Sequence, residues 1–394
     1  MRKIDLNNFR VATNETARDI NSRILLNLVR KNQPISRADL MRQSGLQRST
    51  VSVITEQLIG EGWVLEGAVG QLPRGRRPTF LHLNEKRAGI FGINIQPFTT
   101  DIGLANLSGQ FLDQETITTP HTSAAFVTQF STRVRELMKK FPMSAYEGIG
   151  VSLPGRVDLA SQKFVFSPNL SWHAADLKGQ LENATGLPVS MENAANACAL
   201  SEIWFGKYSE GVRNIVVVTV SEGIGVGMIL NGQLVRGASG LAGEFGHVTI
   251  DEDGPVCACG NRGCWEVFAS NSAAIRYYNE AGRGKHPVKT FAEILALAGQ
   301  GNPRALNALE RMAEYIGKGV AMLVMGFAPE IIVIVGEITH VWGKVSPIVT
   351  NMVQRRASTH PAVKIIASNP ASQPRLRGIV ALVLQKHFWA PTIA

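Results

Sequence analysis

Four residues between positions 247 and 264 have the types and the spacing of a metal site, namely His247, Cys257, Cys259 and Cys264. Glycines lie between them, so a tight loop can bring the four side chains to one ion. Thiolates and imidazole are preferred ligands of Zn2+, and four protein ligands leave no open coordination position. The pattern therefore predicts a tetrahedral Cys3His site in which Zn2+ is structural. The alternatives, three incidental buried cysteines with a core histidine or a disulfide pair, are disfavoured in a chain with 4 cysteines and no other mark of secretion.

Two carboxylates flank this loop in the sequence. Glu244 lies three residues before His247, and Glu266 lies two residues after Cys264. A loop fixed by a metal would hold both acids at defined positions. Carboxylate oxygens accept hydrogen bonds from neighbouring hydroxyl groups, so a pair of acids beside a glycine-rich loop suits a polyhydroxyl ligand. The pair predicts a sugar-binding site next to the metal.

The segments that carry these residues read Gly-Glu-Phe-Gly-His over 243–247 and Cys-Ala-Cys-Gly-Asn-Arg-Gly-Cys-Trp-Glu over 257–266. This pattern resembles the signature of the ROK family (repressors, open reading frames and sugar kinases). The resemblance implies zinc at the four residues named above, with Glu244, His247 and Glu266 facing a sugar. Two further segments, Pro-Asn-Leu-Ser-Trp ending at residue 172 and Glu-Asn at 192–193, match the family and imply that Asn169 and Asn193 also contact the effector.

The same resemblance covers the chain from residue 88 onward and implies two actin-like, hexokinase-like α/β lobes with the sugar between them. Kinase chemistry is not expected in these lobes. Family kinases carry Glu-Asn-Asp-Ala-Asn where this chain has Ala194 in place of the aspartate, so no carboxylate is placed to accept the proton of the sugar hydroxyl. The two phosphate-binding turns of the kinases are also altered, because Pro97 has no N–H to donate and Glu222 would repel a phosphate. We therefore expect that the chain is not an enzyme.

The first 83 residues are more basic than the rest of the chain. They carry 13 Lys+Arg against 7 Asp+Glu, a net charge of +6 out of +9 for the whole chain. The pattern predicts a helix over 18–32 with Ile20, Ile24, Leu25, Leu28 and Val29 facing inward, a second helix over 37–43 capped by Ser36, and a third over 47–59. A glycine-containing turn separates the last two, which is typical of a helix-turn-helix whose last helix enters the major groove of DNA.

Two strands, over 63–66 and 79–83, predict a two-stranded wing after the third helix. An arginine-rich segment lies between the strands, where it could follow a phosphate backbone or a minor groove. The alternative is that these charges form only a solvated surface. The residues expected to contact DNA are Arg37, Gln47, Arg48, Ser49, Thr50, Ser52, Arg74, Arg76 and Arg77.

The predicted fold class is α/β, with an N-terminal winged helix-turn-helix followed by a two-lobed actin-like/hexokinase-like domain. The expected boundaries are 1–85 for the DNA-binding domain, 86–200 for the first lobe together with a C-terminal helix over 375–390, and 201–374 for the second lobe with the zinc loop. No run of eighteen apolar residues and no signal peptide occurs, so a cytoplasmic location without membrane contact is expected.

These features together predict a DNA-binding transcriptional regulator, foremost a repressor of carbohydrate-utilisation genes. It is expected to bind double-stranded operator DNA as a homodimer or homotetramer, because two-fold symmetry pairs recognition helices with the two halves of an operator. The expected effector is a sugar or a sugar phosphate. Two alternatives remain open at this point: an ATP-dependent sugar kinase that carries a DNA-binding arm, and a regulator controlled by a protein partner.

Overall fold

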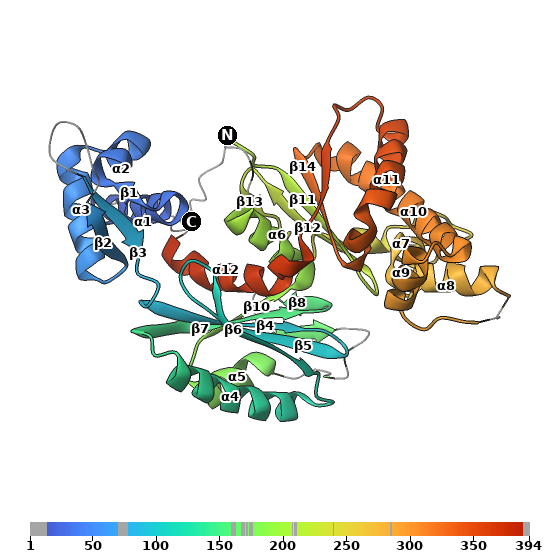
Figure 1. Ribbon diagram of the computed structural model, residues 1–394, viewed down its shortest axis with the longest axis horizontal. Coiled ribbons are helices and arrows are strands. Elements are labelled where there is room, and N and C mark those ends of the chain that lie inside the picture. Colours follow the sequence, from blue (N-terminus) through green and yellow to red (C-terminus); the bar gives the residue numbers. More distant parts are fainter. Residues whose placement is uncertain are drawn as a thin grey trace.

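The computed structural model describes residues 14–69, 78–158, 163–166, 170, 172, 176–206, 208, 211–238, 240–283 and 286–388. They form an N-terminal unit and two α/β lobes, with the last helix lying among all three (Figure 1). None of the helices in these ranges has the length and apolar character needed to cross a membrane.

The N-terminal unit consists of three helices and a small antiparallel sheet. Its elements are α1 (Asn14–Asn32), β1 (Ile35–Ser36), α2 (Arg37–Ser44), α3 (Arg48–Gly60), β2 (Val64–Val69) and β3 (Thr79–Leu83). The three predicted helices are confirmed, and Ser36 caps α2 in a capping box with Asp39. The predicted two-stranded wing is confirmed as the antiparallel pair of β2 and β3, and β1 adds an unpredicted third strand beside β3. This strand is only two residues long and ends in the capping residue, so the sequence reveals the cap and not the strand.

The inward face predicted for the first helix is partly wrong. Leu25 and Val29 are fully buried as expected, but Ile24 is 42% exposed and Leu26 is buried in its place. The reason is that α1 packs on two partners, with α3 and β3 on one side and the C-terminal helix on another. The buried stripe is therefore rotated away from Ile24.

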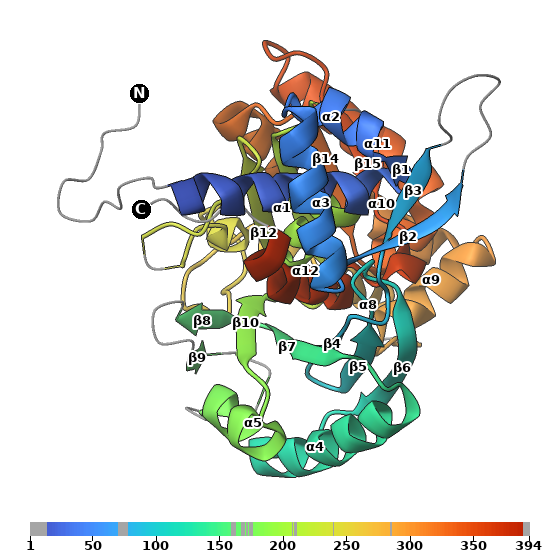
Figure 2. The same ribbon diagram turned by 90° about the vertical axis from the view of Figure 1, so that its left-hand side faces the viewer.

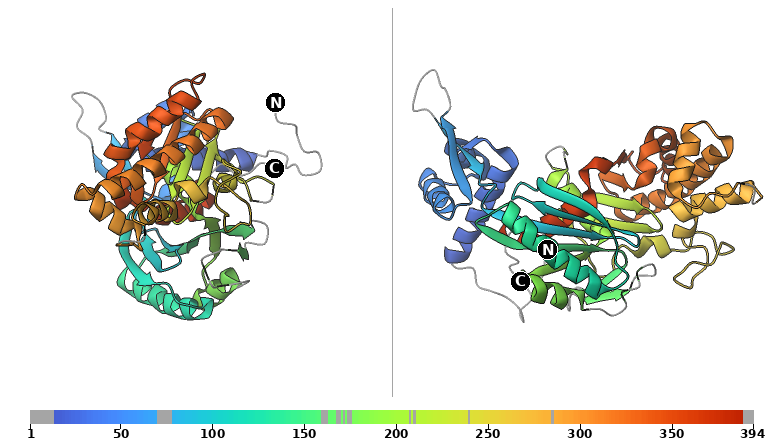
Figure 3. Two further views of the ribbon diagram at one scale, coloured as in Figure 1. Left: turned by 90° about the vertical axis from the view of Figure 1, so that its right-hand side faces the viewer. Right: turned by 60° about the horizontal axis from the view of Figure 1, so that its bottom comes forward.

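The first lobe is built on a five-stranded mixed sheet with the order β10-β7-β4-β5-β6. Its strands are β4 (Ala88–Ile95), β5 (Thr99–Ala105), β6 (Phe111–Thr118), β7 (Ala145–Leu153) and β10 (Val189–Asn193). Strands β4, β7 and β10 are parallel, so their carboxyl ends meet at one edge. Helices α4 (Ser123–Lys140) and α5 (Leu177–Thr185) cover the outer face of this sheet (Figure 3), and β8 (Arg156–Asp158) and β9 (Lys163–Phe166) form a separate hairpin.

The second lobe has a five-stranded sheet with the order β13-β12-β11-β14-β15. Its strands are β11 (Ile215–Val220), β12 (Ile224–Leu230), β13 (Gln233–Leu234), β14 (Ile331–Val335) and β15 (Lys364–Ala367). One face packs on a large helical cluster, and the segment that leads into the metal loop lies beside the beginning of β12. The helices are η1 (Glu244–His247), α7 (Glu266–Ala269), α8 (Asn271–Ala281), α9 (Phe291–Gly299), α10 (Pro303–Phe327), η2 (Glu337–Val341), α11 (Trp342–Arg356) and η3 (Pro370–Ser372).

Two helices lie between the sheets, α6 (Ala194–Phe205) and α12 (Pro374–Phe388) (Figure 1). Helix α6 contacts β11 and β12, and α12 contacts α6, β4 and β7, which confirms the prediction that the last helix packs back on the first lobe. The far end of α12 meets α1 of the N-terminal unit (Figure 2). One apolar cluster accordingly includes Leu25 of α1, Leu81 of β3 and Leu384 of α12.

The packing of α10 on Trp265 gives a stability prediction. A Cβ atom on Gly319 would lie 1.9 Å from Cε2 of Trp265, whose ring is fully buried and whose Nε1 donates to the carbonyl oxygen of Tyr315 at 2.8 Å. We expect Gly319→Ala to lower the free energy of unfolding by at least about 1–3 kcal/mol through overpacking. Gly326→Ala in the same helix is the control, since nothing lies within 4 Å of its Cβ position. Chemical denaturation of both variants measures the difference, and equal stabilities would contradict the close packing of Gly319 on Trp265.

Candidate metal, effector and DNA-binding sites

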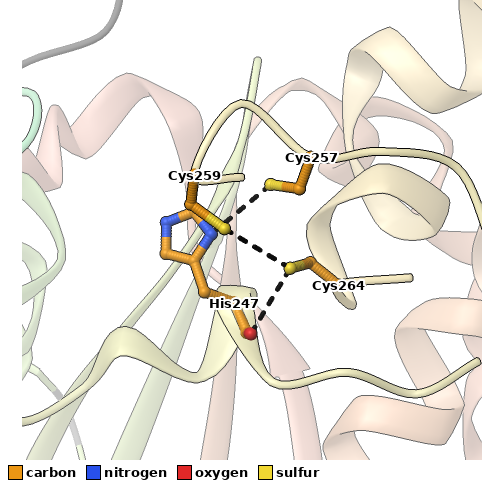
Figure 4. A group of neighbouring side chains, drawn as sticks. All are labelled: His247, Cys257, Cys259 and Cys264. Carbon is orange, nitrogen blue, oxygen red and sulfur yellow. Dashed lines mark hydrogen bonds between the residues drawn. The ribbon is translucent and has the colours of Figure 1, made fainter. Parts of the chain in front are cut away.

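His247, Cys257, Cys259 and Cys264 come together at one point of the second lobe (Figure 4). Each offers one ligand atom, and these four atoms lie within 4.8 Å of one another. Nδ1 of His247 is 3.6 Å from Sγ of Cys257, and Sγ of Cys259 is 3.6 Å from Sγ of Cys264. The fold thus brings together the four residues that the sequence singled out as a group of metal ligands.

These separations suit a tetrahedral ion. With metal–sulfur bonds of about 2.3 Å, sulfur atoms at tetrahedral angles lie about 3.8 Å apart, near the 3.6 Å between Sγ of Cys259 and Sγ of Cys264. Burial raises the pKa of Cys257, and burial together with neighbouring thiols raises that of Cys264 to about 12. A cation that binds here therefore displaces protons and binds more weakly as the pH falls. The donor set and its spacing could hold one thiophilic divalent metal.

A tight turn of the backbone sets the ligands in place. The N–H of Cys257 donates to the carbonyl oxygen of Asn261 at 2.8 Å, and that of Gly263 donates to the carbonyl oxygen of Pro255 at 2.9 Å. Gly263 has φ of 63°, and a Cβ atom there would lie 1.5 Å from the carbonyl oxygen of Asp251. Only glycine fits this position, and the turn can then present Cys257 and Cys264 toward one point.

The imidazole of His247 faces two groups. Its Nδ1 points at Cys257, and its Nε2 is 3.8 Å from Oε2 of Glu244. A histidine that binds a metal through Nδ1 carries its proton on Nε2, so the ring can donate a hydrogen bond on the side of Glu244. The side chain of Glu244 is 49% exposed. An open carboxylate and an imidazole donor therefore stand side by side next to the metal cluster.

Glu266, the first residue of α7, joins this loop to the turn before β12. Its Oε2 accepts a hydrogen bond from the N–H of Ile224 at 3.1 Å, while its Oε1 lies 3.6 Å from Sγ of Cys257. A Cβ atom on Gly223 would lie 2.1 Å from Oε2 of Glu266, so a larger residue there would displace this carboxylate. One carboxylate oxygen is thus engaged by the backbone, and the sugar contact predicted for Glu266 stays a prediction.

The junction of β10 and α6 carries Ala194, the position at which the resemblance predicts that an aspartate of the kinases is replaced. Oδ1 of Asn193 caps α6 by accepting from the N–H of Asn196 at 2.8 Å, and Ala194 follows with a methyl group. The neighbouring carboxylate of Glu192 is 2% exposed and accepts from Nε of Arg236 at 2.9 Å. Glu192 is therefore paired with a residue of the second lobe.

The start of α6 lies against the same strand as the metal loop. A Cβ atom on Gly225 of β12 would lie 3.1 Å from Cβ of Ala195, and one on Gly246 would lie 2.2 Å from the carbonyl oxygen of Ile224. The beginning of β12 is thus bordered by the elements that carry four of the predicted effector contacts, namely Asn193, Glu244, His247 and Glu266. The fifth, Asn169, lies outside the described residues.

Sequence reasoning missed two arginines that connect the lobes. One is Arg236, and the other is Arg375 at the start of α12. Nη1 of Arg375 donates to Oε1 of Gln96, which follows β4, at 2.9 Å, and Nη2 donates to Oγ of Ser221, which follows β11, at 3.4 Å. These partners are 279 and 154 positions away in the chain, so no local pattern announces them. The two acceptors, Gln96 and Ser221, belong to the turns that correspond to the altered phosphate-binding turns of the kinases.

The start of α3 is suited to contact an acidic polymer. Gln47, Arg48 and Ser49 are exposed, Thr50 and Ser52 are partly exposed, and α3 lies on the side of the N-terminal unit away from the second lobe (Figures 1 and 2). No acidic residue occurs in the first turn of α3, and no side chain caps its N–H groups. Within the described part of the chain, Arg48 has no carboxylate within salt-bridge distance. The exposed helix start therefore offers a free guanidinium and free N–H donors.

Arg37 differs from Arg48 in this respect. Its Nη1 is 2.8 Å from Oε1 of Glu66 in β2, so its charge is already paired within the unit. A DNA contact by Arg37 would compete with this pair. Three further residues predicted to bind DNA, Arg74, Arg76 and Arg77, lie outside the described residues.

Comparison with known proteins covers almost the whole chain. The profile of the ROK family matches residues 90–386, and a profile described as winged helix-turn-helix DNA-binding matches residues 18–64. These two matches correspond to the two lobes and to the N-terminal unit. They confirm the fold class predicted from the sequence.

Individual proteins resemble the chain to different extents. A xylose repressor of Bacillus subtilis is 35% identical over 352 residues, with 89% of each chain covered. A glucokinase of Streptomyces coelicolor is 31% identical over 265 residues, which is 63% of this chain and 81% of the glucokinase. The crystal structure of a ROK family transcriptional regulator, a homologue of the Escherichia coli Mlc protein, superposes with a TM-score of 0.80 at 25% identity, covering 95% of this chain and 98% of the other.

Proposed function

The chain belongs to the ROK family, and we propose that it is a transcriptional repressor that binds operator DNA and is released by a sugar bound between its two lobes. The observation that carries this proposal is the combination of an exposed basic helix start in α3 with lobes whose catalytic position is Ala194. The first feature serves DNA binding, and the second retains ligand-binding groups without a base for phosphoryl transfer. A repressor acts where the chromosome lies, so the proposal includes a cytoplasmic site of action.

We propose that the effector is a sugar, with D-xylose as the first candidate. The support is the similarity to a xylose repressor over 89% of both chains. Asn193, Glu244, His247 and Glu266 border β12 and offer amide, carboxylate and imidazole groups, which are the polar groups that bind sugar hydroxyls. Asn169 belongs to the same proposed set by its place in the sequence.

We propose that the metal ion has a structural role and stabilises the loop beside the effector site. Zn2+ bound by His247, Cys257, Cys259 and Cys264 would fix the loop and, through it, the positions of Glu244 and Glu266. The ring of His247 would bind the metal through Nδ1 and present the N–H of Nε2 toward the sugar side. All four positions of the ion are then filled by the protein, so the role is structural.

On the DNA side, α3 is proposed to enter the major groove. Gln47, Arg48, Ser49, Thr50 and Ser52 would contact bases or phosphates from its first turns. The same role is proposed for the arginines at 74, 76 and 77 and, in competition with Glu66, for Arg37. Binding of two half-sites requires two such units, so the proposal includes a homodimer or a homotetramer.

A sugar kinase is the second candidate, and the similarity to a glucokinase favours it. Two observations speak against it. That similarity spans 63% of this chain. The carboxylate of Glu192, next in sequence to the catalytic position, is buried and paired with Arg236. A kinase would need a base other than this paired carboxylate.

The central prediction concerns DNA binding and its release. The purified protein should bind DNA from its own upstream region in a gel-shift or fluorescence-anisotropy assay, and D-xylose should weaken that binding by about tenfold or more at fixed salt, a typical allosteric coupling. L-arabinose and D-glucose serve as matched sugars. Release by one of these sugars and not by D-xylose would support the repressor function but identify a different effector sugar.

Two outcomes would overturn the proposal. Absence of specific DNA binding would remove the repressor function. Turnover of ATP in the presence of D-xylose or D-glucose, abolished by Glu266→Ala, would establish the kinase instead. DNA binding that no sugar alters would point to control by a protein partner.

Arg48 provides a test of the DNA-binding face. Arg48→Ala should weaken operator binding, because a free guanidinium at the start of α3 is lost. A phosphate contact would lower the slope of log K against log salt by about one, and a base contact would cost about 1–3 kcal/mol of sequence discrimination. Arg356→Ala, at the exposed end of α11, is the control. Equal affinities of both variants and the wild type would exclude Arg48 from the interface.

Cysteine variants provide a test of the metal. We expect one zinc ion per chain in the wild type by mass spectrometry of the digested protein, and none in Cys259→Ser. Loss of the ion should lower the melting temperature, because metal binding contributes directly to folding of the loop. Cys198→Ser is the control, since Cys198 is a buried free cysteine outside the cluster. Equal zinc contents in the two variants would show that the ligands are misassigned.

A further inference from the structure

Helix α12 is held at both ends by polar contacts to different parts of the molecule. At its start, Arg375 donates to Gln96 of the first lobe and to Ser221 of the second lobe. The two acceptors belong to different sheets and are connected in space by this side chain. A change in the distance between the two lobes must therefore lengthen or break at least one of these hydrogen bonds.

The partners of Arg375 are neutral groups. Its guanidinium is partly buried and has no carboxylate within 4.0 Å in the described part of the chain. A buried charge with neutral partners depends strongly on its hydrogen bonds, because water does not replace them fully. Gln96 is held in turn by Asp101, which accepts from its Nε2 at 3.3 Å. The first-lobe side of the link is thus fixed.

The second-lobe side of the link continues toward the proposed effector site. The carbonyl oxygen of Ser221 accepts from the N–H of Asn271 at 2.7 Å. Three residues further along the same turn, the N–H of Ile224 donates to Glu266 at 3.1 Å. The turn that Arg375 touches is therefore attached to a residue of the metal loop and to the start of α8.

The other end of α12 is attached to the DNA-binding unit. Nη1 of Arg23 donates to the carbonyl oxygen of Lys386 at 3.0 Å, and Nδ2 of Asn27 donates to the carbonyl oxygen of Phe388. These carbonyls belong to the last turn of the helix, where no further N–H of the helix reaches them. The ring of His387 packs on that of Trp63 with centroids 4.7 Å apart. A displacement of the end of α12 would therefore also displace helix α1 and the start of β2.

Helix α12 is suited to move as a rigid body. It spans 15 residues, so Arg375 and Phe388 are separated by about 20 Å along its axis. Gly378 lies so close to α6 that a Cβ atom there would be 1.7 Å from the carbonyl oxygen of Ala197. Most of the helix is buried between neighbours, and the described residues place no proline inside it after Pro374. A shift at its start is therefore passed to its end instead of being absorbed by bending.

We propose that Arg375 is the positioning residue through which the relative position of the two lobes is passed, along α12, to the winged helix-turn-helix. This inference rests on the proposed function, because it names the route by which sugar binding alters DNA binding. Coupling of this kind requires that the contacts of Arg375 differ between the sugar-bound and DNA-bound states. Arg375 would then determine the response to the sugar without contacting sugar or DNA.

Arg375→Met tests the proposal, with Arg377→Met as the matched control. Arg377 lies in the same turn of α12 and carries the same charge, but its guanidinium packs over the ring of Phe205 and makes no hydrogen bond between the lobes among the described residues. In Arg375→Met we expect D-xylose to change the DNA dissociation constant by less than about twofold, against about tenfold in the wild type and the control. D-xylose binding by calorimetry and DNA affinity without sugar should stay within about threefold of the wild type.

Two further variants separate coupling from simple loss of structure. Arg375→Lys keeps the charge but cannot reach both acceptors with a planar fork, so it should restore the response only in part. Asn27→Ala removes a contact at the opposite end of α12 and should reduce the response in the same way. A full response to D-xylose in Arg375→Met would overturn the proposal. Lost sugar binding in that variant would also overturn it, because Arg375 would then belong to the sugar site itself.

Amide hydrogen exchange tests the role of Arg375 without sugar or DNA. Arg375→Met should speed exchange of amides in α1, about 20 Å from the substitution along α12, whereas Arg377→Met should not. Changes confined to the start of α12 would overturn the proposal. A wild type that binds no DNA, or whose DNA binding no sugar alters, would refute the proposed function, while hydrogen exchange would still decide the role of Arg375.

Discussion

The close packing of α12 on α6 is the contact on which the arrangement of the whole molecule depends. The carbonyl oxygen of Ala197 occupies the space that a side chain at Gly378 would need. Each of the two helices serves more than one unit: α6 covers the second sheet, and α12 covers the first sheet and reaches α1. Leu25 of α1 and Leu384 of α12 belong to one cluster of buried apolar side chains. The N-terminal unit is therefore attached to the lobes by a shared core and not only by a linker. A displacement in one unit therefore has a defined mechanical route to the others.

Much of the local structure could be predicted from the sequence, because it depends on short-range chemistry. Ser36 followed three residues later by Asp39 marks a capping box, and the run Ile331–Val335 has the β-branched composition of a buried strand. The grouping of His247 with three cysteines also follows from spacing, since a short glycine-rich loop leaves its side chains few ways to point. In each case the residues that decide the structure lie within a few positions of one another.

Contacts between distant segments could not be predicted in the same way. Ile24 satisfies the helical pattern of α1, but it is exposed because the helix has a second partner in α12, which follows some 350 positions later. The pairing of Glu192 with Arg236 and the bridge formed by Arg375 depend on how the two sheets are placed around α6 and α12. No periodicity encodes such pairs, and an isolated arginine near the start of a helix is common in any chain. The sequence therefore identified the altered turns at Gln96 and Ser221 but not the residue that joins them.

Under the proposed function, the bridge formed by Arg375 would let the two lobes respond to a sugar alone. The resemblance to family kinases implies that nucleotide phosphates lie in those enzymes at the turns that here contain Gln96 and Ser221. In this chain an arginine of the protein connects the same turns, and no nucleotide is needed to relate them. The proposed loss of a kinase base at Ala194 would have a consistent effect, because a sugar that is not converted stays at equilibrium with its site. An equilibrium ligand shifts the DNA-bound population by its differential affinity for the two states, which is the property that a repressor requires.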